Sequence, residues 1–199
     1  MLSRRSWHFA SKVSSVRSLL ATALFLILSL ATHSAQAQNG DICVDSLPQI
    51  KGLNLISGSL ISSGLPSSED FAKLKSANVE AVISVIPPVA DEAQPDLSAI
   101  HSEGLIFYTV PFDLAAPIAA IESFKAAMNA LEGKNLIIFC ASNNRASIML
   151  YTHHLITSGE ADDSYLKEGL VLSDFLTEAS KIYDNFVAPI EKHYGVTIK

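Results

Sequence analysis

Apolar and polar residues alternate along the chain in blocks that predict short strands separated by helices. Residues 79–86, 104–110 and 135–139 are nearly continuous apolar runs rich in Val, Ile and Phe, which is typical of buried strands. Residues 53–61 indicate a short strand pair or one bent strand. Because strands that alternate with helices favour a parallel sheet, we predict an α/β fold with a mostly parallel sheet of about four to five strands flanked by helices.

The segments between these runs carry helical spacing or helix-start residues. Residues 117–131 place apolar side chains three and four positions apart, which predicts an amphipathic helix. Ser67 and Ser68 precede Glu69 and Asp70, and a hydroxyl followed by acids favours a helix start. The predicted helices cover residues 69–77, 90–103, 117–131, 145–158, 163–178 and 181–194.

The first 37 residues have a different composition from the rest. They hold four Lys and Arg and no Asp or Glu, an apolar run at 19–31, and the small-residue pattern Ala35-Gln36-Ala37. This order is typical of a cleaved signal peptide, and the apolar run is shorter than the about 20 residues that span a bilayer. We therefore expect cleavage of residues 1–37 after Ala37, a periplasmic or secreted chain without a stable membrane span, an extension at 38–52 and one domain at 53–199. An uncleaved N-terminal anchor is the alternative.

The charge of the chain is uneven in the same way. The formal net charge is -6, but residues 38–199 hold only ten Lys and Arg against twenty Asp and Glu. A domain this acidic repels phosphate backbones, so we expect neither nucleic acid nor an anionic membrane as a partner. Arg145 is the only arginine after residue 17.

Arg145 closes the loop in which the chemistry of the chain gathers. Cys140 directly follows the apolar run at 135–139, and Arg145 opens the next predicted helix. Backbone N–H groups and the helix dipole at such a position favour an anion and the thiolate form of cysteine. An arginine there is repelled by the dipole unless an anion lies beside it. The pattern predicts a cysteine nucleophile at an anion site; the alternatives are a buried structural cysteine or a Cys43–Cys140 disulfide.

Other chemistry-bearing residues form no comparable pattern. His153 and His154 are adjacent rather than four residues apart, and the glycines form no nucleotide-binding motif. We therefore expect neither a metal nor a cofactor.

Four stretches occur in a recognisable order, namely SGLPSSEDF at 63–71, LKSANVEAVI at 74–83, EGLIFYTVPFD at 103–113 and FCASNNR at 139–145. They resemble the bacterial branch of dual-specificity, protein-tyrosine-phosphatase-like proteins. The resemblance implies a tyrosine-phosphatase-like fold and hydrolysis of a phosphorylated small molecule or phosphoprotein through a cysteinyl-phosphate.

The same resemblance assigns roles to residues. It makes Cys140 the nucleophile, Arg145 the phosphate ligand that stabilises the transition state, and Asp113 the general acid. It places the substrate phosphate against the loop and the start of the helix, formed by Ala141, Ser142, Asn143, Asn144 and Ser147. Three carboxylates on the neighbouring strand-exit loop remain alternative acids, namely Asp91, Glu92 and Asp96, and Asp113 has an alternative role as a turn residue before Pro117.

The loop also departs from the phosphatase pattern. The spacing is Cys-x4-Arg instead of Cys-x5-Arg, Phe139 replaces the preceding His, and no glycine lies between Cys140 and Arg145. The residue after Arg145 is Ala146 instead of Ser or Thr, with Ser147 one position further. Rhodanese-type sulfurtransferases use Cys-x4-Arg loops, so sulfur transfer through a Cys140 persulfide is one alternative function. An inactive module that binds anions or phosphopeptides is the other.

Overall fold

The computed structural model describes residues 40–89, 91–170 and 183–198. They belong to one compact unit, Asn39–Lys199. The predicted signal peptide, residues 1–37, lies outside the described residues. Within the described ranges, no helix is both long and apolar enough to cross a membrane.

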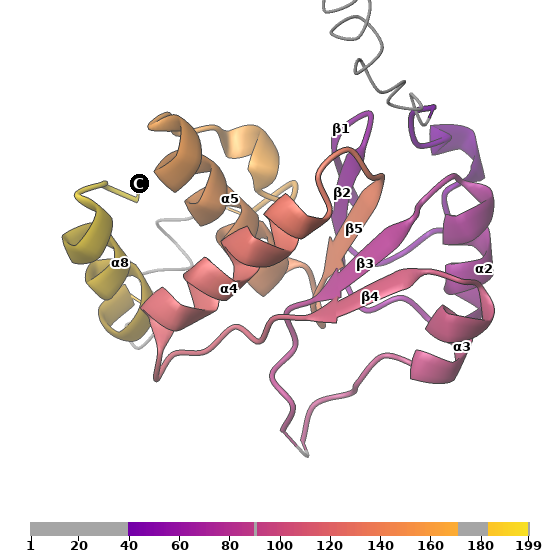
Figure 1. Ribbon diagram of the computed structural model, residues 1–199, viewed down its shortest axis with the longest axis horizontal. Helices are drawn as coiled ribbons and strands as arrows, with labels where there is room; N and C mark the ends of the chain where they lie inside the picture. Colours follow the sequence, from indigo (N-terminus) through magenta and orange to yellow (C-terminus); the bar gives the residue numbers. More distant parts are fainter. Residues whose placement is uncertain (1–39, 90, 171–182, 199) are drawn as a thin grey trace, which may run out of the picture. The chain divides into compact units, whose positions relative to one another are not determined.

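Five strands form one sheet (Figure 1). They are β1 (Asn54–Ser57), β2 (Leu60–Ser63), β3 (Ala81–Ser84), β4 (Ile106–Thr109) and β5 (Leu136–Phe139). Their order is β1-β2-β5-β3-β4, in which only the β1–β2 pair is antiparallel. The prediction of an α/β fold with a mostly parallel sheet is therefore confirmed.

Helices cover the two faces of this sheet (Figure 1). One side carries α2 (Ser68–Ser76) and α3 (Leu97–Ser102), and the other carries α4 (Pro117–Ala130), α5 (Asn144–Ser158) and α8 (Ala188–Tyr194). Shorter turns of helix are η1 (Val44–Ser46), η2 (Asp163–Tyr165) and the π-helical η3 (Tyr183–Val187). The predicted extension at 38–52 contributes Ile42 and Ile50 to the core.

The central strand β5 fixes the place of the residue that follows it. All four of its residues are buried, and Phe139 packs edge-on against Phe71 of α2, with ring centroids 6.4 Å apart. Phe139 is in register with Ser63 of β2 and Ser84 of β3. The three strands therefore end level with one another, and Cys140 begins the loop at this edge.

Two predicted elements need correction at their boundaries. The buried strand predicted at 104–110 is instead the edge strand β4, whose Ile106 and Tyr108 are 39% and 37% exposed because only β3 pairs with it. The helix predicted at 90–103 begins only at Leu97. Pro95 disfavours helical backbone at Gln94, and Asp96 then caps α3 through the Ser98 and Ala99 N–H groups.

The helix predicted at 163–178 is wrong over the part that the structure describes. Only the 3-10 turn Asp163–Tyr165 forms, and Leu166 is extended. The Asn54 side chain donates to the carbonyl oxygens of Ser164 and Leu166, acceptors that a continuing helix would need. Residues 171–178 lie outside the described residues, as do residues 181 and 182 of the helix predicted at 181–194.

Candidate active site

Cys140 is a buried free thiol at the carboxyl edge of the sheet. Its side chain and backbone are together 1% exposed, and its N–H donates to the Ser63 carbonyl at 3.2 Å, which extends the pairing of β5 with β2. Cys43 is also a free thiol, but it is exposed. Its N–H donates to the carbonyl of Ala77, which precedes β3, so Cys43 lies near the opposite edge. The alternative of a Cys43–Cys140 disulfide does not hold in this structure.

Asn143 takes the conformation that a glycine commonly supplies in a tight loop. Its φ is 71°, in the left-handed region that Asn tolerates better than most residues. The side chain is buried, and its Nδ2 donates to the Gly52 carbonyl at 2.6 Å and to Ser62 Oγ at 2.9 Å. The hydrogen bonds to Gly52 and Ser62, which lie outside the loop, hold Asn143 in this conformation. The loop therefore turns without a glycine.

Two glycines outside the loop make room for its carbonyl groups. A Cβ on Gly52 would lie 3.3 Å from the Ser142 carbonyl oxygen, and a Cβ on Gly64 would lie 3.2 Å from that of Ala141. Gly64 and Ser142 also form an isolated antiparallel β-bridge, so the start of the loop is held against the residue that follows β2.

Lys167 braces the same outer side. Its backbone N–H donates to Ser147 Oγ at 3.0 Å, and its Nζ donates to the Ser142 carbonyl at 3.4 Å. Ser147, which the resemblance places among the phosphate ligands, is buried. Its hydroxyl oxygen accepts the hydrogen bond from the Lys167 N–H. Its role as a substrate ligand stays a prediction.

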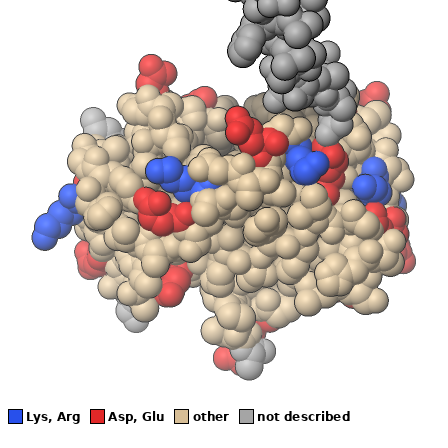
Figure 2. Space-filling view, in the orientation of Figure 1, with Lys and Arg blue, Asp and Glu red and all other residues tan. Residues whose placement is uncertain are grey.

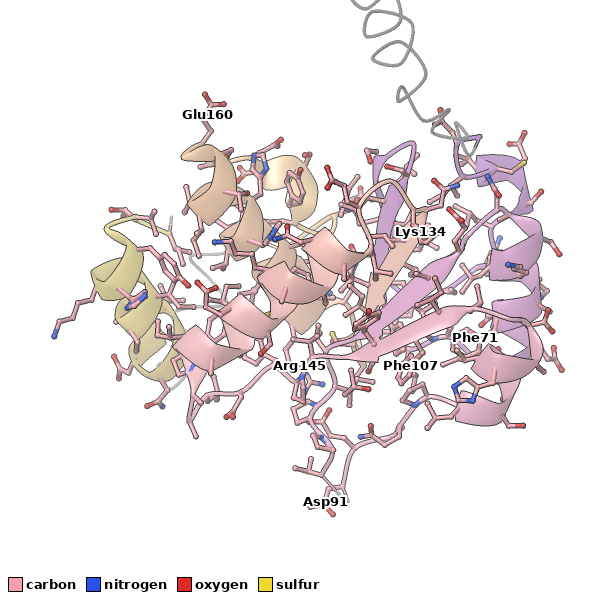
Figure 3. All side chains as sticks on the ribbon, in the orientation of Figure 1. Phe71, Asp91, Phe107, Lys134, Arg145 and Glu160 are labelled. Atoms are coloured by element: carbon pink, nitrogen blue, oxygen red, sulfur yellow. The ribbon has the colours of Figure 1, made fainter. Side chains whose placement is uncertain are left out.

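Arg145 forms a two-point ion pair that the sequence pattern did not single out. Its Nη1 donates to Glu92 Oε1 at 2.8 Å, and its Nη2 donates to Glu92 Oε2 at 2.6 Å. Glu92 comes from the loop between β3 and α3, and Figure 3 shows Arg145 beside this loop, whose outer end carries Asp91. The anion expected beside a cation at a helix start is therefore, in this structure, a carboxylate of the chain itself.

The ion pair between Arg145 and Glu92 shifts the pKa of both side chains, and Cys140 adds to the shift of Arg145. The hydrogen bond with Glu92 raises the pKa of Arg145, and Cys140 raises it further by Coulombic attraction and a hydrogen bond, while burial opposes both. The same hydrogen bond with Arg145 lowers the pKa of Glu92.

Asp113 lies on the loop that leaves β4. Phe112 anchors this loop, since its N–H donates to the Val85 carbonyl at 3.0 Å and its ring stacks on Phe186 at 4.3 Å. Asp113 itself is exposed, and its Oδ1 accepts the Ala115 N–H at 2.8 Å. Among the described residues it forms no hydrogen bond or ion pair with Cys140 or Arg145, so its role as general acid stays a prediction.

The alternative acids separate in the structure. Glu92 pairs with Arg145, and Asp91 is exposed. Asp96 caps α3 and accepts the Ser68 hydroxyl at 2.7 Å, and this hydrogen bond is the main cause of its lowered pKa. A lowered pKa keeps a carboxyl group ionised at neutral pH, so neither Glu92 nor Asp96 holds a proton for a leaving group.

The remaining loop residues differ in exposure. Ala141 is exposed, whereas Ser142 and Asn144 are half-buried. The Oδ1 atoms of Asn143 and Asn144 are buried acceptors that lack a hydrogen-bond partner in the described part of the chain. In that part, no three or more His, Cys, Asp or Glu side chains form a group that would hold a metal ion.

Comparison with known proteins gives matches among solved structures. No protein-family model and no curated protein matches the sequence. Two structures of a candidate phosphatase (DUF442) from Shewanella putrefaciens CN-32 match. The first has 28% identity and a TM-score of 0.58 and covers 72% of this chain and 99% of that chain. The second has 27% identity and a TM-score of 0.60 and covers 75% of this chain and 92% of that chain.

A more distant match agrees in fold. TpbA from P. aeruginosa has 16% identity and a TM-score of 0.50, and the match covers 81% of this chain and 99% of that chain. The structural neighbours of the chain are cysteine-based, protein-tyrosine-phosphatase-like proteins, as the sequence resemblance predicts.

Proposed function

We propose that this protein, which has the fold of the cysteine-based, protein-tyrosine-phosphatase-like proteins, hydrolyses phosphomonoesters through a cysteinyl-phosphate on Cys140. One observation carries the proposal. The buried free thiol of Cys140, directly after β5, and the guanidinium of Arg145, in the first turn of α5, flank one short strand-to-helix loop. A thiolate nucleophile and the donors for a tetrahedral oxyanion then share one site.

The reaction has two steps. The Cys140 thiolate attacks phosphorus, the sulfur–phosphorus bond forms, and the bond to the leaving oxygen breaks while Asp113 donates a proton to that oxygen. Water then attacks phosphorus and gives a proton to the Asp113 carboxylate, the sulfur–phosphorus bond breaks, and phosphate leaves. Arg145 and the loop amides bind the non-bridging oxygens throughout, where they stabilise the added charge.

The substrate class follows from the same site. It is a phosphorylated small molecule or a phosphoprotein, met in the periplasm or outside the cell if residues 1–37 direct export as their composition indicates. The acidic composition of residues 38–199 supports the exclusion of nucleic acid.

Hydrolysis of p-nitrophenyl phosphate by the purified chain tests the proposal. Cys140→Ser should reduce the rate to background, whereas the matched control Cys43→Ser, at the exposed thiol, should keep the wild-type rate. Acid quenching during turnover should trap phosphate on the peptide that contains Cys140. Equal rates for wild type and Cys140→Ser would refute the proposal.

The length of the loop favours a second candidate function. Cys-x4-Arg is the spacing of sulfurtransferases, and a short loop suits a persulfide. The test is transfer of sulfur from thiosulfate to cyanide with the same two variants. Transfer that requires Cys140, together with no hydrolysis of aryl phosphates, would replace the phosphatase proposal.

A further inference from the structure

The guanidinium of Arg145 has five N–H donors, and the ion pair with Glu92 uses two of them. Glu92 takes one hydrogen from each terminal nitrogen, which is the end-on edge of the group. This arrangement leaves the side-on edge, made of Nε–H and one terminal N–H, for a second pair of acceptors. A tetrahedral phosphate presents such a pair. One arginine can therefore hold Glu92 and a substrate anion at the same time.

The backbone around Glu92 is fixed by hydrogen bonds of its own loop. The Glu92 N–H donates to the Val89 carbonyl at 3.2 Å. The Gln94 side chain donates to the carbonyls of Pro87 at 2.9 Å and of Glu92 at 3.3 Å. Beyond this turn, the Ser68 hydroxyl ties Asp96, the cap of α3, to the start of α2. The Glu92 carboxylate therefore reaches Arg145 from a backbone that these hydrogen bonds hold in place.

Arg145 needs such an anchor at its position. The dipole of α5 repels a cation at the first turn of the helix. Its long side chain would also have to be ordered at an entropic cost if it were free in solvent. The side chains of Arg145 and Glu92 are 20% and 30% exposed, so the pair is partly shielded from water.

From this geometry we propose that Glu92 is the positioning residue of Arg145, holding the guanidinium by its end-on edge so that the side-on edge faces the oxyanion above Cys140. The inference rests on the proposed phosphatase function. Glu92, which the sequence presents as one of three alternative acids, acts here in its ionised form.

The test compares Glu92→Gln with wild type in two measurements. One is orthophosphate binding, by titration calorimetry, and the other is the separate effect on kcat and KM for p-nitrophenyl phosphate. A misplaced guanidinium should weaken phosphate binding and raise KM, and should lower kcat/KM by about 10- to 100-fold. The matched control is Glu103→Gln, which removes the same charge from the half-buried C-cap residue of α3 and should behave as wild type.

A second variant separates positioning from a general loss of structure. In an Arg145→Lys background the anchor has no planar group to orient, so adding Glu92→Gln should change kcat/KM and phosphate binding by less than about twofold. An effect as large as in the wild-type background would mean that Glu92 acts on something other than Arg145, and would overturn the proposal.

Two further outcomes are distinct. If wild type hydrolyses the aryl phosphate and Glu92→Gln binds phosphate equally well or more tightly, Glu92 is a bystander or a competitor for Arg145, and only this inference fails. If wild type neither binds phosphate nor hydrolyses the ester, the proposed function fails, and the inference fails with it.

Discussion

At the scale of single residues, the loop between Cys140 and Arg145 shows how an asparagine can stand where a glycine is common. Asn143 adopts φ of 71° and uses its buried amide to bind the Gly52 carbonyl and the Ser62 hydroxyl. The side chain thereby compensates for the strain that its own Cβ introduces. A glycine would turn the chain equally well but would lose both hydrogen bonds.

Asn143→Ala and Asn143→Gly separate these two contributions. Alanine keeps the strain and leaves the Gly52 carbonyl and Ser62 hydroxyl without their donor, so it should lower the free energy of unfolding by about 2–4 kcal/mol. Glycine removes the strain and should cost less. Urea denaturation of both variants checks the order, and a smaller loss for alanine would contradict it.

The ion pair of Glu92 and Arg145 makes stability depend on pH. The hydrogen bond from Arg145 holds the pKa of Glu92 below its ordinary value of 4.5. Because the folded pKa is lowered, the contribution of the pair is present above pH 4.5 and is lost as pH falls through the folded value.

Wild type should therefore be more stable than Glu92→Gln at pH 7, and the difference should shrink progressively below pH 4.5. Urea denaturation of both proteins at several pH values measures it. A difference that does not change with pH would indicate that the carboxylate stabilises the fold by packing alone.

At the scale of elements, three strand exits meet at one edge of the sheet. The loops after β3, β4 and β5 supply Glu92, Asp113 and Cys140, and the hydrophobic runs before them were enough to predict the strands. The pattern could not predict which carboxylate meets Arg145, because that depends on a turn closed by Gln94 and Pro87 rather than on periodicity. The pattern also predicts a helix from residue 163 onward, where only a 3-10 turn forms over the described residues. Asn54 of β1, distant in sequence, donates to the backbone carbonyls of Ser164 and Leu166 there.

The loop after β4 gives a prediction about leaving groups. If Asp113 donates the proton, Asp113→Asn should slow hydrolysis of phenyl phosphate by about 10²-fold or more, because phenolate leaves poorly without one. The loss on p-nitrophenyl phosphate should be much smaller, since that leaving group needs little protonation. Steady-state kinetics on both esters decide the matter, and equal losses would assign Asp113 to the turn that it forms with Ala115.

At the scale of the whole molecule, positive charge is scarce. On the face shown in Figure 2, Asp and Glu are spread widely and Lys and Arg appear only in separate spots. The charge of Arg145 is balanced by Glu92, so the long-range field that a substrate anion meets is set by an acidic domain.

Salt should therefore favour the approach of an anionic substrate. Raising NaCl from about 10 mM to about 150 mM shortens the Debye length from about 30 Å to about 8 Å and screens the repulsion. We expect kcat/KM for p-nitrophenyl phosphate to rise over this range at constant pH. A steep fall would instead show that attraction by unbalanced cations brings the substrate to the site.

The common register of β2, β5 and β3 also sets the order in which the molecule opens. Phe139 has a partner on each side, Ser63 and Ser84, so the backbone just before the thiol is held by two ladders and is released only when both separate. Amide protons of β5 should then exchange with deuterated solvent last, near the rate set by global unfolding. Those of β1, paired on one side only, should exchange earlier. The site is built at the point where the fold is slowest to come apart.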